Sequence, residues 1–82
     1  MTTTIPLPRY EAWPATGRYP AKVRHTWWDS KGRRCHSFVV SCEGNTNKEA
    51  GVNAALCAYA LASYYGGVVD TSRVCDPVLR GI

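Results

Sequence analysis

The sequence lacks the usual signatures of catalysis and of bound metal. Its four cysteines form no C-x-x-C pair, which zinc sites commonly use. Gly66-Gly67 stands outside any phosphate-loop motif, and Ser and Cys nucleophile signatures are missing. The carboxylates are scattered along the chain. We therefore expect a protein that is not an enzyme, with no catalytic residue, metal ligand or cofactor.

The first residues do not have the pattern expected of an apolar leader. Pro6, Pro8 and Pro14 stand where a secretory signal would have its apolar core. We expect a cytoplasmic protein, in which thiols stay reduced, and we expect no membrane span. Cys35 and Cys42 are seven residues apart, so a regular strand would point them to opposite faces. All four cysteines are expected to be free thiols: Cys35, Cys42, Cys57 and Cys75.

Charge is absent from a long helix-forming stretch. No Asp, Glu, Lys or Arg occurs from Ala50 to Val69. The stretch is too polar and rich in alanine for a membrane span, yet too apolar for an ordinary surface helix. A chain of 82 residues has little material to cover it. Either the whole chain wraps this helix, or a partner covers part of it.

The net charge is +4, and the positive charge is concentrated in one region. Residues 18–48 hold seven cations against Asp29 and Glu43, a local charge of +5: Arg18, Lys22, Arg24, Lys31, Arg33, Arg34 and Lys48. Such a region suggests an anionic partner, either nucleic acid or an acidic protein face. The alternative is a solvated face that keeps the protein soluble.

Residues 18–43 have the pattern of a β-hairpin. Residues 18–29 and 33–43 alternate in polarity, as half-buried strands do, and Asp29-Ser30-Lys31-Gly32 reads as the turn between them. On the first strand, one face is expected to carry Tyr19, Ala21, Val23, His25 and Trp27, and the other Lys22, Arg24, Thr26 and Trp28. On the return strand, one face is expected to carry His36, Phe38, Val40 and Cys42.

A helix follows the hairpin. Thr46-x-x-Glu49 fits a capping box, and Gly66-Gly67 ends the helix after Tyr65. One face is expected to lie on the sheet: Ala50, Ala54, Cys57, Ala58, Leu61 and Tyr65. Val68-Val69 and residues 72–75 are candidates for a short further strand.

Residues 1–17 contain three prolines, which favour an extended arm over a helix. Ile5, Leu7, Tyr10 and Trp13 are expected to pack this arm on the domain. The predicted fold class is α+β: an antiparallel β-hairpin, one packed α-helix and a short third strand (ββαβ). The predicted organisation is an arm at 1–17 and one domain at 18–82.

The hairpin carries the best binding signal, because aromatic and basic residues on a sheet can stack bases and neutralise phosphates. The same residue types dominate protein–protein hot spots. The predicted partner-binding residues are Lys22, Arg24, Trp28, Lys31, Arg33 and Arg34. A second candidate interface is the reverse face of the helix, with Val52, Leu56 and Tyr59. His25 and His36 are expected to share the apolar side of the hairpin as structural histidines.

Residues 19–65 resemble the last part of a double-stranded-RNA-binding domain. In that family a K-K-x-A-K cluster opens the final helix and holds phosphates, followed by alanines that face the sheet. Lys48 and Ala50 match this cluster, whereas Asn47 and Gly51 stand in place of lysines. Ala54, Ala55 and Ala58 match the alanine stripe.

Residues 17–75 resemble the architecture of small phage-encoded anti-CRISPR proteins. The shared features are a strand that starts at Gly17-Arg18-Tyr19, a hairpin, an alanine-rich helix with a glycine stop and a short last strand. This resemblance implies a non-catalytic inhibitor in the cytoplasm of the host cell. It would bind a CRISPR nuclease or surveillance complex, a host defence protein or ribonucleoprotein, and block it sterically. The alternatives are a small basic module that binds RNA or DNA, and a homodimer that uses the helix face.

Overall fold

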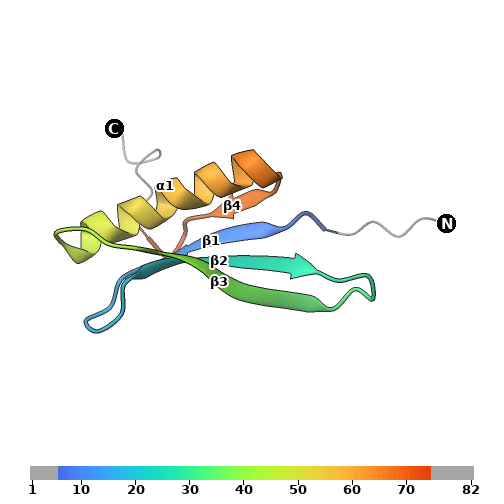
Figure 1. The fold of residues 1–82 in the computed structure, drawn as a ribbon, viewed down its shortest axis with the longest axis horizontal. Coiled ribbons are helices and arrows are strands. Elements are labelled where there is room, and N and C mark those ends of the chain that lie inside the picture. Colours follow the sequence, from blue (N-terminus) through green and yellow to red (C-terminus); the bar gives the residue numbers. More distant parts are fainter. Residues whose placement is uncertain (1–5, 75–82) are drawn as a thin grey trace.

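The computed structural model describes residues 6–74, which form a four-stranded sheet with a helix on one of its faces (Figure 1). The strand order across the sheet is β3-β2-β1-β4. Along the chain, the elements are β1 (Arg9–Trp13), β2 (Ala21–Trp28), β3 (Arg34–Cys42), α1 (Asn47–Tyr65) and β4 (Val68–Asp70).

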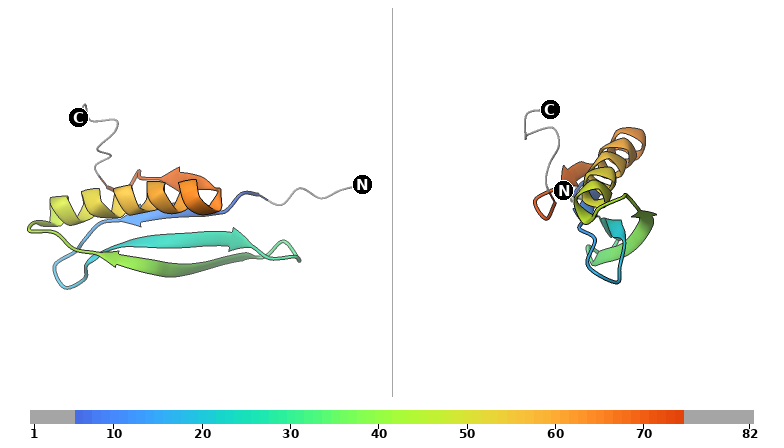
Figure 2. Two further views of the ribbon diagram at one scale, coloured as in Figure 1. Left: turned by 45° about the horizontal axis from the view of Figure 1, so that its top comes forward. Right: turned by 90° about the vertical axis from the view of Figure 1, so that its left-hand side faces the viewer.

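The connections explain where the helix lies. β2 is antiparallel to both β1 and β3, and β4 is parallel to β1, so β3 and β4 run in the same direction. The link between these two strands therefore carries α1 across β2 and β1, and α1 packs mainly on those two strands (Figure 2). The predicted α+β class, with its hairpin, single packed helix and short strand after the helix, is confirmed.

The expected N-terminal arm at 1–17 is wrong for Arg9–Trp13, which form β1 in the interior of the sheet. Pro8 and Pro14 lie just outside this five-residue strand, so neither proline removes a hydrogen-bond donor from it. Tyr10 and Ala12 face α1 and are buried in the core. The structural unit therefore includes residues before the expected boundary at 18. Ile5 lies outside the described residues.

The hairpin of β2 and β3 is confirmed, with strands slightly shorter than expected. Its turn is held by the Asp29 carboxylate, which accepts hydrogen bonds of 2.9 Å from the backbone N–H groups of Lys31 and Arg33. Gly32 has a φ of +79°, as the turn requires. The pKa of Asp29 is lowered, chiefly by the hydrogen bond from the backbone of Arg33.

The return strand contains a β-bulge, which corrects the expected faces. Val23 pairs with Val40 and Arg24 pairs with Phe38, so Val39 is an extra residue in β3. Because one extra residue reverses the alternation, Phe38 faces away from α1 whereas Val40 faces toward it. The prediction that His36, Phe38, Val40 and Cys42 share a face is therefore wrong.

The bulge also changes the predicted sides of two residue pairs, His25 with His36 and Cys35 with Cys42. His25 faces α1 and His36 faces away from it, because His36 pairs with Thr26 on the opposite side of the sheet. Cys35 and Cys42 lie on the same side of β3 instead of opposite sides, since Cys35 pairs with Trp27 and Cys42 with Ala21.

The helix begins and ends where the sequence predicts. The Thr46 side chain accepts a hydrogen bond of 3.1 Å from the backbone N–H of Glu49. Gly66 has a φ of +79°, and its N–H donates to the carbonyl of Ala62 at 2.8 Å. After β4, residues 72–74 form a turn instead of the expected strand, and Cys75 lies outside the described residues. No helix within residues 6–74 has the length and apolar character that a membrane crossing needs.

Small side chains form the contact between α1 and the sheet. Ala54 and Ala58 are completely buried, as predicted, and they pack in one core with Ala12 and Val23. Tyr65, which was expected on this face, is instead 66% exposed. The buried helix residues are Ala50, Gly51, Ala54, Ala55, Ala58 and Ala62. Residues without long side chains allow the helix axis to lie close to the sheet.

This close contact predicts that a larger residue at position 58 destabilises the fold. Ala58→Leu should lower the free energy of unfolding by about 1–3 kcal/mol, because the added carbons have no space. Ala60→Leu is the matched control on the same helix, since Ala60 is exposed. Urea unfolding of both variants measures the difference. Equal stabilities for the two variants would contradict the packing described above.

Candidate functional site

The face of the sheet opposite α1 gathers cations and aromatic rings from three strands. We call it the open face. Strand alternation and register place the following residues on the open face: Arg9, Glu11, Trp13, Lys22, Arg24, Thr26, Trp28, Arg34, His36 and Phe38. Ring contacts confirm this placement, since Trp13 of β1 meets Phe38 of β3 edge-on at 5.7 Å between ring centroids.

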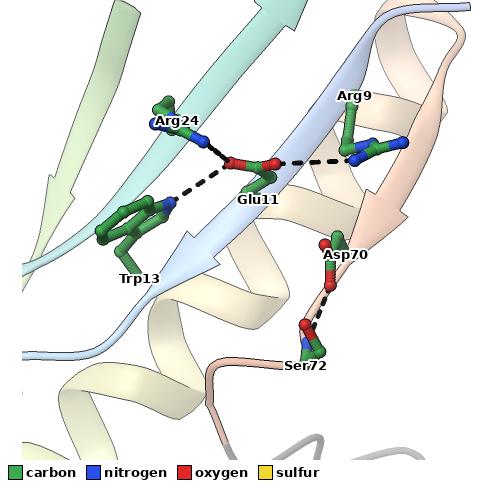
Figure 3. Close-up of polar contacts among 6 residues, drawn as sticks. All are labelled: Arg9, Glu11, Trp13, Arg24, Asp70 and Ser72. Atoms are coloured by element: carbon green, nitrogen blue, oxygen red, sulfur yellow. Dashed lines mark hydrogen bonds and ion pairs between the residues drawn. The ribbon is translucent and has the colours of Figure 1, made fainter.

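A buried carboxylate organises the centre of the open face (Figure 3). The Glu11 side chain is only 6% exposed. Its Oε1 lies 2.7 and 2.8 Å from two nitrogens of Arg24 and accepts a hydrogen bond of 3.3 Å from the Trp13 indole N–H. Its Oε2 lies 3.8 Å from Arg9. Glu11 therefore fixes the positions of a guanidinium group and an indole ring side by side.

Trp13 is surrounded by positive charge. The guanidinium carbons of Arg24 and Arg73 lie 4.8 and 4.5 Å from its ring centroid. The Lys22 ammonium lies 4.7 Å from the ring centroid of Phe38 and 5.4 Å from that of Tyr19. At each of these four distances, a cation is attracted to the face of an aromatic ring.

These side chains surround a groove of about 450 Å³. It is bordered by Trp13, Pro14, Thr16, Tyr19, Pro20, Lys22, Phe38 and Arg73. Phe38 and Tyr19 are 47% and 60% exposed, so aromatic surface is accessible to a ligand. The groove thus combines apolar walls with cations at its border.

The charge on this side of the sheet is net positive. Among residues 6–74, five cations and two carboxylates lie on or beside the open face. The cations are Arg9, Lys22, Arg24, Arg34 and Arg73, and the carboxylates are Glu11 and Asp70. Asp70 is held by Ser72, whose backbone N–H donates to it at 2.9 Å (Figure 3). The hydrogen bonds from Ser72, and to a smaller extent the charges of Arg73 and Arg9, lower the pKa of Asp70.

The structure divides the predicted binding residues into two groups. Lys22, Arg24 and Trp28 lie on the open face of β2, and Arg34 pairs with Trp28 from β3. Lys31 and Arg33 belong to the turn at the tip of the hairpin. Arg33 forms an ion pair of 2.9 Å with Asp29, so the carboxylate of Asp29 balances the positive charge of Arg33 within the turn.

The sequence prediction does not include Trp13, Phe38 and Arg73, which line the groove. Trp13 was assigned to the arm, although Arg9, Glu11 and Trp13 alternate with Tyr10 and Ala12 as strand residues do. Phe38 was placed on the wrong face because the bulge has no clear sequence signal. Arg73 comes to the groove from the turn after β4.

The second candidate interface lies on α1, away from the open face. Leu56 is 51% exposed, whereas Val52 and Tyr59 are half-buried. The three residues are therefore not an equally exposed apolar strip. None of the three lines the groove around Trp13.

The helix side of the sheet contains an aromatic stack. The His25 ring lies between those of Tyr10 and Trp27, with both centroid distances at 4.8 Å. Burial lowers the pKa of His25 and raises that of Tyr10, so both groups are neutral at pH 7. The stack packs β1 on β2 and adds no charge to this side.

Within residues 6–74, no three His, Cys, Asp or Glu side chains come together as a metal site. No protein-family model, curated protein or solved structure matches the chain.

Proposed function

We propose that this protein is a non-catalytic nucleic-acid-binding protein that holds its ligand on the open face. The observation that carries the proposal is the Trp13 groove, where aromatic rings from two strands are bordered by Lys22, Arg24 and Arg73. Phosphates attract such cations, and every base has a flat face that stacks on an aromatic ring.

The arrangement of the acidic groups supports an anionic ligand. Glu11 is buried and neutralised by Arg24 and Arg9, and Asp70 is engaged by Ser72. Neither carboxylate therefore presents a free negative charge at the groove. Lys22 has no carboxylate partner among the described ion pairs, and its ammonium lies near the rings of Tyr19 and Phe38, which line the groove with it.

Salt dependence tests this proposal. Fluorescence-anisotropy titrations of single-stranded and duplex probes, in DNA and RNA, should show affinity that falls about 50- to 500-fold between 50 and 200 mM salt, as four or five phosphate contacts imply. Lys22→Ala should reduce the slope of log affinity against log salt by about one.

Lys48→Ala is the matched control. Lys48 lies in the first turn of α1 and does not line the groove, although it borders a neighbouring hollow with Pro14 and Arg73. It is the lysine that resembles the phosphate cluster of double-stranded-RNA-binding domains. Its removal should leave the slope unchanged. Loss of binding in Lys48→Ala with normal binding in Lys22→Ala would place the ligand on the helix. Absence of binding to every probe would refute the proposal.

A second candidate is the phage-type inhibitor of a bacterial defence complex. It is favoured by the free side of β3, where Phe38, Val39 and Val40 are 47%, 47% and 36% exposed. An exposed strand edge with apolar side chains is a common docking surface for protein partners. This candidate predicts weak, salt-insensitive binding to naked nucleic acid and tight binding to a purified CRISPR effector complex. Charged substitutions at Val39 should then abolish inhibition.

A further inference from the structure

Two cysteines from different layers of the fold lie in contact. Cys42 is the last residue of β3, and Cys57 lies in the middle of α1. Their sulfur atoms are 3.5 Å apart, and both are free thiols. Cys42 is 6% exposed, and Cys57 is more accessible.

The surroundings hold the two sulfur atoms together. Four residues before Cys57, the Asn53 side chain donates a hydrogen bond of 2.8 Å to the carbonyl of Glu43, the residue that follows Cys42. Ala21, the β2 partner of Cys42, is completely buried. A disulfide bond is about 2.05 Å long, so the sulfurs need to approach by about 1.5 Å for the bond to form.

We propose that Cys42 and Cys57 are a redox-responsive pair, which closes to an intramolecular disulfide on reaction with a small-molecule disulfide and thereby fastens α1 to β3. The pairing is specific in space. Cys35, which shares the helix-facing side of β3, pairs with Trp27 at the other end of the strand. The pair lies on the helix side, so this inference is independent of the proposed nucleic-acid binding.

The reaction has two exchange steps. The Cys57 thiolate attacks the small disulfide, forms a mixed disulfide with one half and releases the other half as a thiolate. The Cys42 thiolate then attacks the Cys57 sulfur, forms the protein disulfide and releases the second half. Two cysteine thiols are oxidised, each giving its proton to solvent, and one small disulfide is reduced to two thiols.

The environment of Cys42 sets the order of these steps. Burial, with the hydrogen bond to Cys57 as a smaller cause, raises the pKa of Cys42 to about 12. Cys42 is thus a poor first nucleophile at neutral pH, because attack requires the thiolate. The more accessible Cys57 reacts first, and attack by Cys42 limits the overall rate. Closure should therefore accelerate as pH rises.

The test uses the full chain with Cys35→Ser and Cys75→Ser, so that only the pair remains. The protein is treated with oxidised glutathione and digested with trypsin without reduction. Trypsin cuts after Lys48, which separates the peptide of residues 35–48 from that of residues 49–73. We expect these two peptides to be joined and to separate after addition of dithiothreitol.

Thermal unfolding supplies the second readout. Cys42 and Cys57 are 15 residues apart, and closing a loop of this length should raise the Tm by about 10–20 °C. Cys57→Ser in the same background should form no joined peptide and show no oxidant-dependent change in Tm. Persistent glutathione adducts, disulfide-linked dimers alone, or a joined product with unchanged Tm would each overturn the proposal.

Discussion

Replacing Trp13 with alanine should weaken nucleic-acid binding by about 5- to 150-fold, the range that loss of base stacking on one aromatic ring produces. Trp13 is held by the Glu11 carboxylate, is bordered by two guanidinium groups and contacts Phe38. Removing its ring takes away the wall of the groove that β1 contributes. Anisotropy titration with the tightest-binding probe measures the loss, and circular dichroism verifies that the fold remains.

Trp28→Ala is the matched control for this prediction. Trp28 lies on the same strand face as Arg24, but at the hairpin tip and outside the Trp13 groove. It should therefore have the smaller effect. Phe38→Ala should reduce affinity as Trp13→Ala does, because the two rings contact each other. A larger loss in Trp28→Ala than in Trp13→Ala would move the site to the tip of the hairpin.

Arg24→Ala should lower the free energy of unfolding by about 3–5 kcal/mol, the usual result of removing one partner from a buried ion pair. The side chains of Arg24 and Glu11 are 23% and 6% exposed, and the contact is 2.7 Å. Without Arg24, the partners left to the buried Glu11 carboxylate within residues 6–74 are the more distant Arg9 and the indole N–H of Trp13. Urea unfolding measures the change.

A double variant shows whether Arg24→Ala is destabilised by the unpaired charge of Glu11 or by lost packing. Arg24→Ala combined with Glu11→Gln removes the buried charge as well as its partner, so the double variant should recover much of the lost stability. Arg34→Ala, at an exposed position on the same face, should change stability by less than about 0.5 kcal/mol. Equal losses in the single and double Arg24 variants would contradict the role given to Glu11.

Local sequence patterns predict the hairpin and the helix because these elements depend on neighbouring residues. Asp29 and Gly32 define the turn, Thr46 caps the helix, and Gly66 ends it. The alanines at positions 54 and 58 likewise recur at helical spacing on the buried side. None of these features requires knowledge of a distant part of the chain.

The candidate site depends on long-range pairing, which local patterns do not contain. β1 becomes a strand because β2 and β4 supply hydrogen-bond partners on both sides of it. The bulge at Val39 then turns Phe38 toward Trp13. The hairpin pattern predicts the cations Lys22 and Arg24, whereas their aromatic partner Trp13 lies in a segment whose prolines favour an extended arm.

Amide and indole chemical-shift mapping by NMR tests the central claim most directly. Titration of the labelled protein with the tightest-binding oligonucleotide should shift the indole N–H of Trp13 and the backbone amides of Lys22, Arg24 and Phe38. The amides of α1 near Leu56, on the other side of the molecule, should stay in place. Shifts confined to α1, or no shifts at saturating oligonucleotide, would contradict the assignment of the open face as the binding surface.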